Sequence, residues 1–204
     1  MINMKSKALT IAGLLLILAA VLLTLWNIWE GYRVAQVTAR TRKKVEQAVA
    51  VKRAQITPQA GSEGSLPEPG RPMPTVEVDG NHYIGKLEIH SLGLELPVLS
   101  EWSDMLLKTA PCRYTGSAYL DTMVIACHNY RRHFGRLRSL EAGDSVIFED
   151  AEGLCISYVV TLVEQLSGDA VEEMTSGKWD LTLFTCTAGG RKRVTVRCER
   201  VEPE

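Results

Sequence analysis

The sequence predicts a membrane-spanning helix and a linker, followed by an all-β domain of the antiparallel sandwich or barrel class. Eighteen of the 22 residues in the run Ala8–Trp29 are apolar. Five prolines fall between Thr57 and Pro74, and the remainder of the chain consists of short β-rich runs separated by turn residues. The 204 residues therefore make one ordinary domain with N-terminal appendages.

The apolar run Ala8–Trp29 contains no charged side chain. At about 1.5 Å per residue it forms a helix of roughly 33 Å, enough to cross a hydrocarbon core of about 30 Å. Trp26, Trp29 and Tyr32 cluster at its far end, where aromatic rings favour the headgroup layer. A cleaved signal peptide is the alternative, but its apolar region would be shorter and small residues would follow it. We therefore expect residues 1–7 in the cytoplasm and an uncleaved anchor at 8–29.

Two segments connect the anchor to the domain. Residues 30–56 lack proline and are rich in Ala, Val, Arg, Lys and Gln, which predicts a helical stalk. Its basic run Arg40–Lys44 is expected to be a solvated helix face or, alternatively, to contact anionic lipid headgroups. Residues 57–75 form a Pro- and Gly-rich linker, because this composition cannot bury enough apolar area to fold. The globular domain therefore covers residues 76–204.

The net charge of −1 is an average over two unlike parts. Residues 1–55 carry nine Lys/Arg and two Asp/Glu, a net of +7, whereas residues 56–204 carry fourteen and twenty-two, a net of −8. The average argues against a nucleic-acid partner, although the motifs described next are the better reason. By the positive-inside rule, the basic run after the anchor favours a cytoplasmic C-terminus, against the cytoplasmic N-terminus expected above.

Seven β-rich runs predict a domain of seven or eight strands. They are Tyr83–Ile89, Leu94–Leu99, Met123–His128, Ser145–Glu149, Ile156–Gln165, Leu181–Cys186 and Val194–Cys198. Phe134–Leu140 and Ala170–Thr175 are each long enough for one or two helical turns. The sequence has no repeat of 20–50 residues and no glycine-rich phosphate loop.

Cys186 stands apart among the five cysteines, an odd number that leaves at least one thiol unpaired. It ends an apolar run, precedes the turn Thr187–Gly190, and is followed by the cations Arg191–Arg193, which favour a thiolate. It is either a nucleophile or an inert packed thiol. The cysteine spacing contains no CxxC, and Cys127, His128 and His133 complete no recognisable ligand pattern, so we expect no metal and no cofactor.

A nucleophilic cysteine needs a partner that handles protons, and histidine is the usual one. His128 closes an apolar run and would lie at a strand end, whereas His133 lies in a basic loop and is expected to be solvated. An arginine can stabilise the oxyanion of a tetrahedral intermediate. Arg197 should lie far along the return strand, which leaves Arg191 and Arg193 as candidates.

Three motifs in the order His, Cys, Arg resemble those of the sortases, the membrane-anchored cysteine transpeptidases of Gram-positive bacteria. Thr182–Cys186 resembles the TLxTC signature of this family. Ala126–His128 is similar to its histidine strand, where a glycine usually stands at the position of Cys127. Arg193–Arg200 is similar to its arginine strand and selects Arg193 over Arg191. Residues 83–98 resemble the family's opening hairpin.

The resemblance implies an eight-stranded sortase-type β-barrel with short helices, in which Cys186 attacks the Thr–Gly bond of an LPxTG-like sorting signal. An amine of a cell-wall precursor or of a pilin would resolve the thioacyl-enzyme. His128 would protonate the leaving amine and deprotonate the incoming one, while Arg193 would stabilise the oxyanion or position the signal. The protein substrates would be surface proteins with a C-terminal sorting signal, and the catalytic domain would lie outside the cell membrane.

By the same resemblance, Ala126, Phe184 and Thr185 would contribute to the groove that binds the signal. Fifty-seven residues separate His128 from Cys186, too few for the helical insertion of class B enzymes, and the lid motif common in class C is absent. A class D-like or unclassified clostridial type is therefore favoured. The alternatives are an exported cysteine protease that hydrolyses its acyl-enzyme and a non-catalytic domain that binds wall polymer.

Cys127 and Cys198 depart from the usual sortase pattern. If they lay near Cys186 they could form a mixed or regulatory disulfide, but two packed thiols are the simpler expectation.

Overall fold

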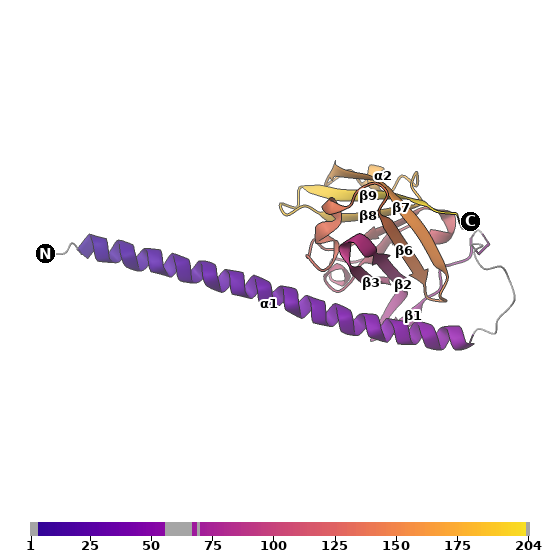
Figure 1. Ribbon diagram of the computed structural model, residues 1–204, viewed down its shortest axis with the longest axis horizontal. Helices are drawn as coiled ribbons and strands as arrows, with labels where there is room; N and C mark the ends of the chain where they lie inside the picture. The colour runs from indigo at the N-terminus through magenta and orange to yellow at the C-terminus, as the bar shows by residue number, and fades with distance from the viewer. Residues whose placement is uncertain (1–3, 56–66, 69, 203–204) are drawn as a thin grey trace.

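The computed structural model describes residues 4–55, 67–68 and 70–202 and combines one long helix with a β-barrel (Figure 1). The helices are α1, Met4–Gln55, and α2, Val171–Met174. The strands are β1 Val76–Val78, β2 Asn81–Ile89, β3 Leu94–Leu99, β4 Cys112–Thr115, β5 Met123–Ala126, β6 Ser145–Asp150, β7 Cys155–Ser167, β8 Leu181–Cys186 and β9 Lys192–Arg200. Short 3-10 turns lie at His90–Leu92, Leu106–Lys108, Ala118–Leu120 and Phe134–Ser139.

The sheet closes on itself. Its strand order is β1-β2-β3-β4-β5-β8-β9-β7-β6, and β6 pairs with β2 as well. Strands β2 to β9 therefore form a closed eight-stranded barrel, to which β1 is added beside the first residues of β2. The pairs β3–β4 and β5–β8 are parallel and the others are antiparallel. The eight-stranded barrel that the resemblance implied is confirmed.

Closure of the barrel depends on a glycine in β2. Gly85 has a φ of +152°, and a Cβ at this position would lie 2.0 Å from the carbonyl oxygen of Glu149 in β6. Only glycine avoids this clash, so the strand can bend there and pair with β3 on one side and β6 on the other.

Alternate residues of the strands fill the barrel. Leu87, Ile125, Leu183 and Val196 are completely buried in this core. Phe134 of the 3-10 turn Phe134–Ser139 is also fully buried there. Burial of each such side chain contributes about 1.5–3 kcal/mol, so this core is the main source of the domain's stability.

Helix α1 is one unbroken element of 52 residues, about 78 Å long at 1.5 Å per residue. It contains both the predicted anchor and the predicted stalk. Its segment Leu9–Trp29 has a mean hydropathy of 2.6 and is long and apolar enough to cross a membrane. Residue 56 of the predicted stalk and residues 57–66 and 69 of the predicted linker lie outside the described part of the chain.

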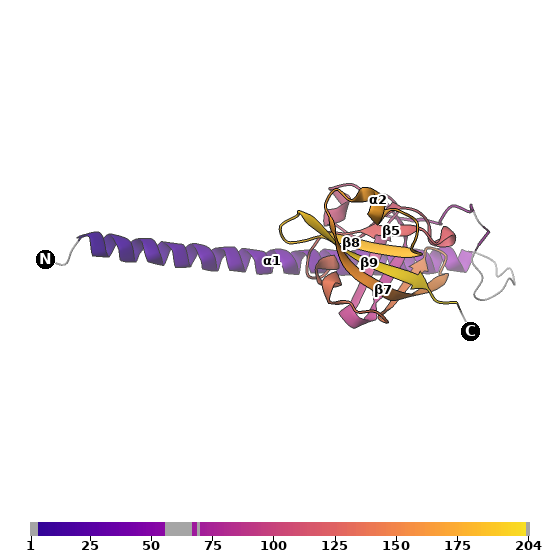
Figure 2. The same ribbon diagram turned by 90° about the horizontal axis from the view of Figure 1, so that it is seen from above.

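The C-terminal part of α1 lies along the barrel, as both ribbon views show (Figures 1 and 2). Val45 of the helix is only 2% exposed. It packs in an apolar cluster whose barrel members include Val76, Val78, Tyr83 and Leu99. This contact fixes the helix against β1, β2 and β3.

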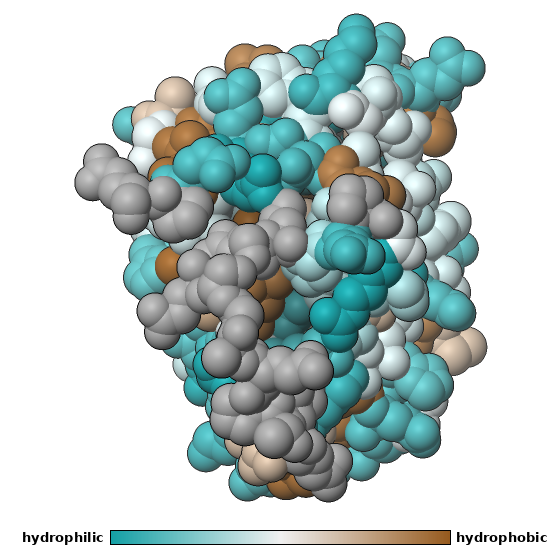
Figure 3. Space-filling model, turned by 90° about the vertical axis from the view of Figure 1, so that its right-hand side faces the viewer, coloured by the Kyte–Doolittle hydropathy of each residue, from teal (hydrophilic) through white to brown (hydrophobic). Residues whose placement is uncertain are grey.

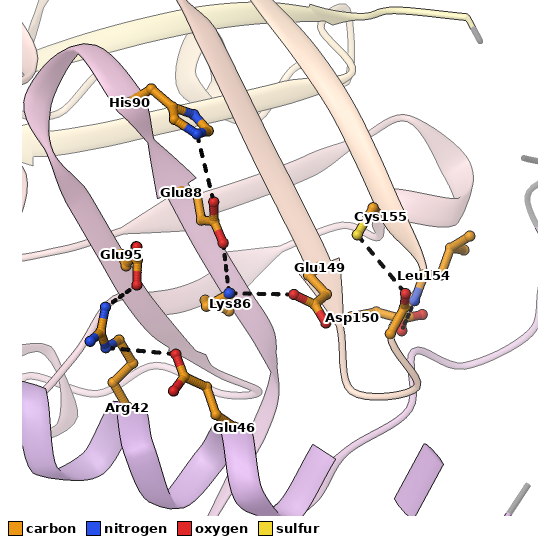
Figure 4. A network of polar contacts seen from close by, with 11 residues as sticks. Arg42, Glu46, Lys86, Glu88, His90, Glu95, Glu149, Asp150, Leu154 and Cys155 are labelled. Atoms are coloured by element: carbon orange, nitrogen blue, oxygen red, sulfur yellow. Dashed lines mark hydrogen bonds and ion pairs between the residues drawn. The ribbon is translucent and has the colours of Figure 1, made fainter. Parts of the chain in front are cut away.

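Ion pairs border this contact. Arg42 pairs with Glu46 of the helix and with Glu95 of β3, where the two side chains point toward each other (Figure 4). Lys44 Nζ lies 2.7 Å from an oxygen of Asp79. Both cations keep solvent-accessible side chains, so the basic face is solvated as expected and in addition pairs with the acidic domain.

The direction of α1 relative to the barrel follows from contacts at its two ends. Thr38 contacts His133 of the loop after β5, whereas Lys52 lies 3.8 Å from Glu152 in the β6–β7 turn. The apolar segment therefore projects beyond the end of the barrel that carries His133. The opposite end is mainly hydrophilic outside the grey residues (Figure 3).

Candidate active site

The candidate residues lie at neighbouring strand ends. In the sheet β5 is next to β8 and β8 is next to β9. The Ala126–Phe184 pair aligns β5 with β8, so His128, two residues further on, is level with Cys186. Cys186 is paired directly with Arg193 across β8 and β9. The fold thus brings together the three side chains that the motifs predicted.

These residues also share one face of the sheet. Side chains alternate between the two faces of a strand. Ile125 and Leu183 belong to the barrel core, so Ala126 and Phe184, one residue on, face outward. Cys186 follows Phe184 by two residues and faces outward as well. It is half-buried, as are His128 and Arg193, so the thiol lies near the surface.

The two arginine candidates differ in their setting. Arg193 lies in β9 opposite Cys186, and its Nη1 donates to the carbonyl oxygen of Gly190 at 2.8 Å. Arg191 is exposed in the turn before β9. Arg197 is paired with Thr182, further along β8. The pairing therefore favours Arg193 as the arginine that acts beside the thiol.

Arg197 is occupied by the fold itself. Its guanidinium is buried and donates to Glu164 Oε1 at 2.9 Å and to the carbonyl oxygen of Glu173 at 2.8 Å. A third bond, 3.1 Å long, reaches Thr182 Oγ1. These bonds tie α2 to the outside of the barrel, a structural role.

The imidazole of His128 is tuned toward its neutral form. Burial lowers its pKa below the usual 6.5, the cation of Lys108 lowers it further, and Asp104 acts in the opposite direction. The ring of Tyr130 lies 5.2 Å from the imidazole, centroid to centroid. His128 is therefore mainly neutral at pH 7 and able to accept a proton.

An apolar patch covers the outer face below Cys186. Val124, Ala126, Met174 and Phe184 form a buried cluster there, with Leu107, Tyr114 and Leu166 packed against it. The edge of Tyr114 meets the ring of Phe184 at 5.3 Å between centroids. We call these seven residues the outer-face patch. Sequence reasoning found two of them, and strand alternation could have added Val124, two residues before Ala126.

Thr185 does not belong to the outer-face patch. It is 3% exposed, and its hydroxyl donates to the carbonyl oxygen of Cys127 at 2.8 Å. This bond holds β8 against the residue that precedes His128. The structure thus separates Thr185 from Ala126 and Phe184, which lie on the opposite face.

The prediction of a solvated His133 is wrong. Its side chain has no exposed surface. Its Nε2 shares a 3.0 Å hydrogen bond with Thr38 Oγ1 of α1. Burial, together with the neighbouring His128, lowers the pKa of His133 to about 4. His133 is therefore neutral and structural at pH 7.

We expect His133 to make the stability of the protein depend on pH. An unfolded histidine binds its proton at about pH 6.5 and the folded one only near pH 4. The contribution is therefore complete above about pH 6.5 and is lost as the pH falls toward 4, by about 3 kcal/mol. Thermal melting between pH 4 and 8 measures this slope. His133→Gln should flatten it and exposed His90→Gln should not; equal slopes in both variants would contradict the assignment.

All five cysteines are free. Burial raises the pKa of Cys112 and Cys198 to about 12 and that of Cys127 well above its usual value. These three are packed, protonated thiols. Cys155 is exposed, in the strand that follows the β6–β7 turn. Among the described residues, no group of three or more His, Cys, Asp or Glu side chains is arranged to hold a metal ion.

A closed eight-stranded barrel with a near-surface cysteine beside a histidine and an arginine defines the class of protein. The sortase domain family matches residues 87–201, more than half of the chain, and the chain belongs to the sortase family. It is 31% identical over 117 residues to Sortase A of Bacillus anthracis. That match covers 54% of this chain, which spans about half the length (55%) of the relative.

Solved structures of sortases share the fold. Sortase C1 from Streptococcus suis superposes with a TM-score of 0.52 at 25% identity, covering 60% of this chain and 74% of that one. Sortase C1 from Streptococcus agalactiae gives 0.57 at 18% identity, covering 83% and 100%. Sortase C from Clostridium perfringens SM101 gives 0.51 at 20%, covering 82% and 91%. Because the relatives include sortases A and C, the class D-like assignment stays a prediction.

Proposed function

We propose that this sortase is a cysteine transpeptidase that cleaves an LPxTG-like sorting signal and transfers the protein to an amine. The observation that carries the proposal is the pairing of Cys186 with Arg193 beside His128, at the ends of three neighbouring strands. A nucleophile, a group that transfers protons and a fixed cation are the three requirements of acyl transfer by a thiol.

In the first step neutral His128 accepts the proton of the Cys186 thiol, and the resulting thiolate attacks the carbonyl carbon of the Thr–Gly bond. The carbonyl π electrons move onto the oxygen, and the guanidinium of Arg193 stabilises the resulting oxyanion. As the oxyanion collapses, the C–N bond breaks and the protonated His128 delivers its proton to the leaving amine. The products of this step are a thioester on Cys186 and a released peptide that begins with glycine.

In the second step an amine of a cell-wall precursor or of a pilin attacks the thioester. Neutral His128 removes a proton from the attacking nitrogen, and the Cys186 thiolate leaves with the electrons of the C–S bond. The low pKa of His128 supports this role, because the neutral form predominates at pH 7.

The proposed contact surface for the apolar residues of the signal is the outer-face patch, through its half-buried members Leu107, Tyr114 and Leu166. Its members Ala126 and Phe184 occupy the same face as Cys186, two positions before the reacting strand ends. An extended peptide laid over these residues would bury its Leu and Pro side chains and bring its Thr carbonyl to the thiol.

The segment Leu9–Trp29 is the proposed single-pass anchor. With this segment in the membrane, the catalytic barrel would lie on the extracellular side, where sorting signals and wall amines are found.

The test uses the full chain in lipid nanodiscs with a library of LPxTG-type peptides, with and without an added amine. Mass spectrometry of the products distinguishes the candidate functions. Ligation that depends on the amine supports the proposal, and hydrolysis that the amine does not change would identify a protease. No turnover of any peptide, together with retained binding to wall polymer by Cys186→Ala, would identify a non-catalytic domain.

Arg193→Ala is expected to lower kcat/KM by about 10²–10³-fold, the usual effect of removing one oxyanion donor. Arg191→Ala is the matched control, because Arg191 is an exposed cation in the turn before β9, two residues from Arg193. It should leave kcat/KM within about twofold. A large loss with Arg191→Ala and none with Arg193→Ala would reverse the assignment. Initial rates of peptide ligation at subsaturating substrate measure both.

A further inference from the structure

We propose that α1 is a positioning element of the catalytic site and that Thr38 of this helix holds the loop that presents His128. The inference rests on the proposed function, and it assigns an enzymatic role to a helix whose other part is the proposed anchor. Thr38 and His133 are the positioning residues, and neither contacts the reacting atoms.

The loop after β5 has a compact shape centred on Tyr130. The carbonyl oxygen of Tyr130 accepts hydrogen bonds from the backbone N–H groups of His133 and Gly135, each 2.9 Å long. A Cβ on Gly135 would lie 2.8 Å from that oxygen, so the turn has no room for a side chain there. The backbone from Tyr130 to Gly135 is therefore held in one compact turn, which Phe134 anchors in the barrel core, and His128 lies two residues before this turn.

Ring contacts connect His128 to His133 of this turn. The ring of Tyr130 lies between them, 5.2 Å from that of His128 and 5.7 Å from that of His133. A displacement of His133 would therefore be transmitted through Tyr130 to the imidazole that handles protons.

The turn is held by α1 at His133. His133 is fully buried and Thr38 is only 7% exposed. Their side chains share the 3.0 Å hydrogen bond, across 95 residues of sequence. In a buried setting, loss of this bond leaves a polar atom unsatisfied, so the loop has a strong preference for the position in which the bond is made.

The role of Thr38 differs from that of the residues that dock the helix. Val45 with its apolar cluster, together with the pairs of Arg42 and Lys44, lies further along α1 toward its C-terminal end. A change confined to the Thr38 hydroxyl should therefore leave the helix on the barrel and act on the histidine loop.

The experiment compares three variants of the full chain in nanodiscs. Thr38→Val removes the hydroxyl at nearly constant shape, and Thr38→Ser restores it. Thr24→Val is the matched control, because the hydroxyl of Thr24 bonds only within α1, to the carbonyl oxygen of Ala20. We expect Thr38→Val to lower kcat about tenfold with KM within about twofold, since the groove is unchanged. Thr38→Ser and Thr24→Val should stay within about twofold of the unmodified chain.

A second readout does not depend on turnover. NMR titration of the four histidines gives the pKa of His128 in each variant. Release of the loop exposes His128 to water and should raise its pKa toward 6.5 in Thr38→Val only, with Lys108 and Asp104 unchanged beside it. Melting curves establish that all variants are folded.

The outcomes separate the two proposals. If the unmodified chain ligates no peptide, the proposed function fails, while the shift in the pKa of His128 still tests the positioning role. An unchanged rate and an unchanged His128 pKa in folded Thr38→Val would overturn the positioning role. Equal losses in Thr38→Ser and Thr38→Val would also overturn it, because the effect would not follow the hydroxyl.

Discussion

Cys186→Ala is expected to abolish formation of the acyl-enzyme and to reduce ligation by at least about 10⁴-fold, since it removes the proposed nucleophile. The side chain lies outside the barrel core and is half-buried, so its loss creates no large internal cavity. The variant should therefore melt within a few degrees of the unmodified chain. Intact-mass spectrometry after mixing with peptide should show the acyl adduct in the unmodified chain and none in the variant.

Cys155→Ala is the matched control for this substitution. Cys155 has an exposed thiol in β7, next to the β6–β7 turn that α1 contacts near Lys52. Its pKa is raised by partial burial and by Glu149, so the thiol is a poor nucleophile. Full activity and a full acyl adduct are expected. An adduct that persists in Cys186→Ala and disappears in Cys155→Ala would overturn the identification of the nucleophile.

His128→Ala is expected to lower kcat by about 10²–10⁴-fold, the range that a positioned proton-transfer group contributes. In the proposed mechanism both steps need the imidazole: in the first it takes the thiol proton and passes it to the leaving amine, and in the second it acts as a base toward the incoming amine. Single-turnover measurements can separate the two steps. Acylation should slow with all peptides, and deacylation should slow most with amines whose protonated forms are weak acids. Added imidazole should restore part of the rate if only proton transfer is missing.

His90, and not His133, is the matched control for His128→Ala. His90 is exposed beside Glu88, as the polar network in Figure 4 shows, and His90→Ala should leave ligation unchanged. His133 is unsuitable, although the sequence predicted it to be solvated. Its burial against Thr38 means that His133→Ala would disturb the loop that carries His128.

Local sequence patterns predicted the part of the fold that carries the chemistry. The runs Leu181–Cys186 and Val194–Cys198 are strongly β-forming, and the strands β8 and β9 contain them with the pairing that places Arg193 opposite Cys186. The predicted strand Met123–His128 corresponds to β5, which ends at Ala126, so His128 lies just beyond the strand. These predictions need only local sequence, because the alternation of side chains along a strand and the residue at which the strand ends determine where each side chain lies.

The strands β1 and β4 were not predicted, for a physical reason. They have three and four residues, and β4 pairs with β3 through the single couple Leu99–Cys112. Strands this short hold too few residues for an alternating pattern to be recognised, and they form because neighbouring strands supply their partners. The outer-face patch was found only in part for a similar reason, since Met174 and Tyr114 reach it from separate segments.

The surroundings of the stalk and of His133 depend on tertiary contacts that the local sequence does not predict. The positive charges of Arg40–Lys44 predict a solvated face. The structure adds ion pairs from Arg42 to Glu95 and from Lys44 to Asp79 of the domain. His133 has arginine neighbours on its N-terminal side, and nothing local shows that Thr38 covers it. The +7 of the N-terminal part and the −8 of the remainder are therefore complementary charges within one molecule. With the barrel outside the cell, as proposed, this pairing would give a reason for the basic run to depart from the positive-inside rule.

The unbroken α1 also works as a spacer of fixed length. Thr38 follows Trp29 by nine residues, which is about 14 Å along the helix axis. With Leu9–Trp29 in the bilayer, the loop of the catalytic histidine would be held at about this height, on the end of the barrel that faces the membrane. An extended peptide advances about 3.3 Å per residue. A substrate would then need only about four residues between its own membrane segment and the scissile bond. One additional helical turn in α1 would increase the number of residues needed.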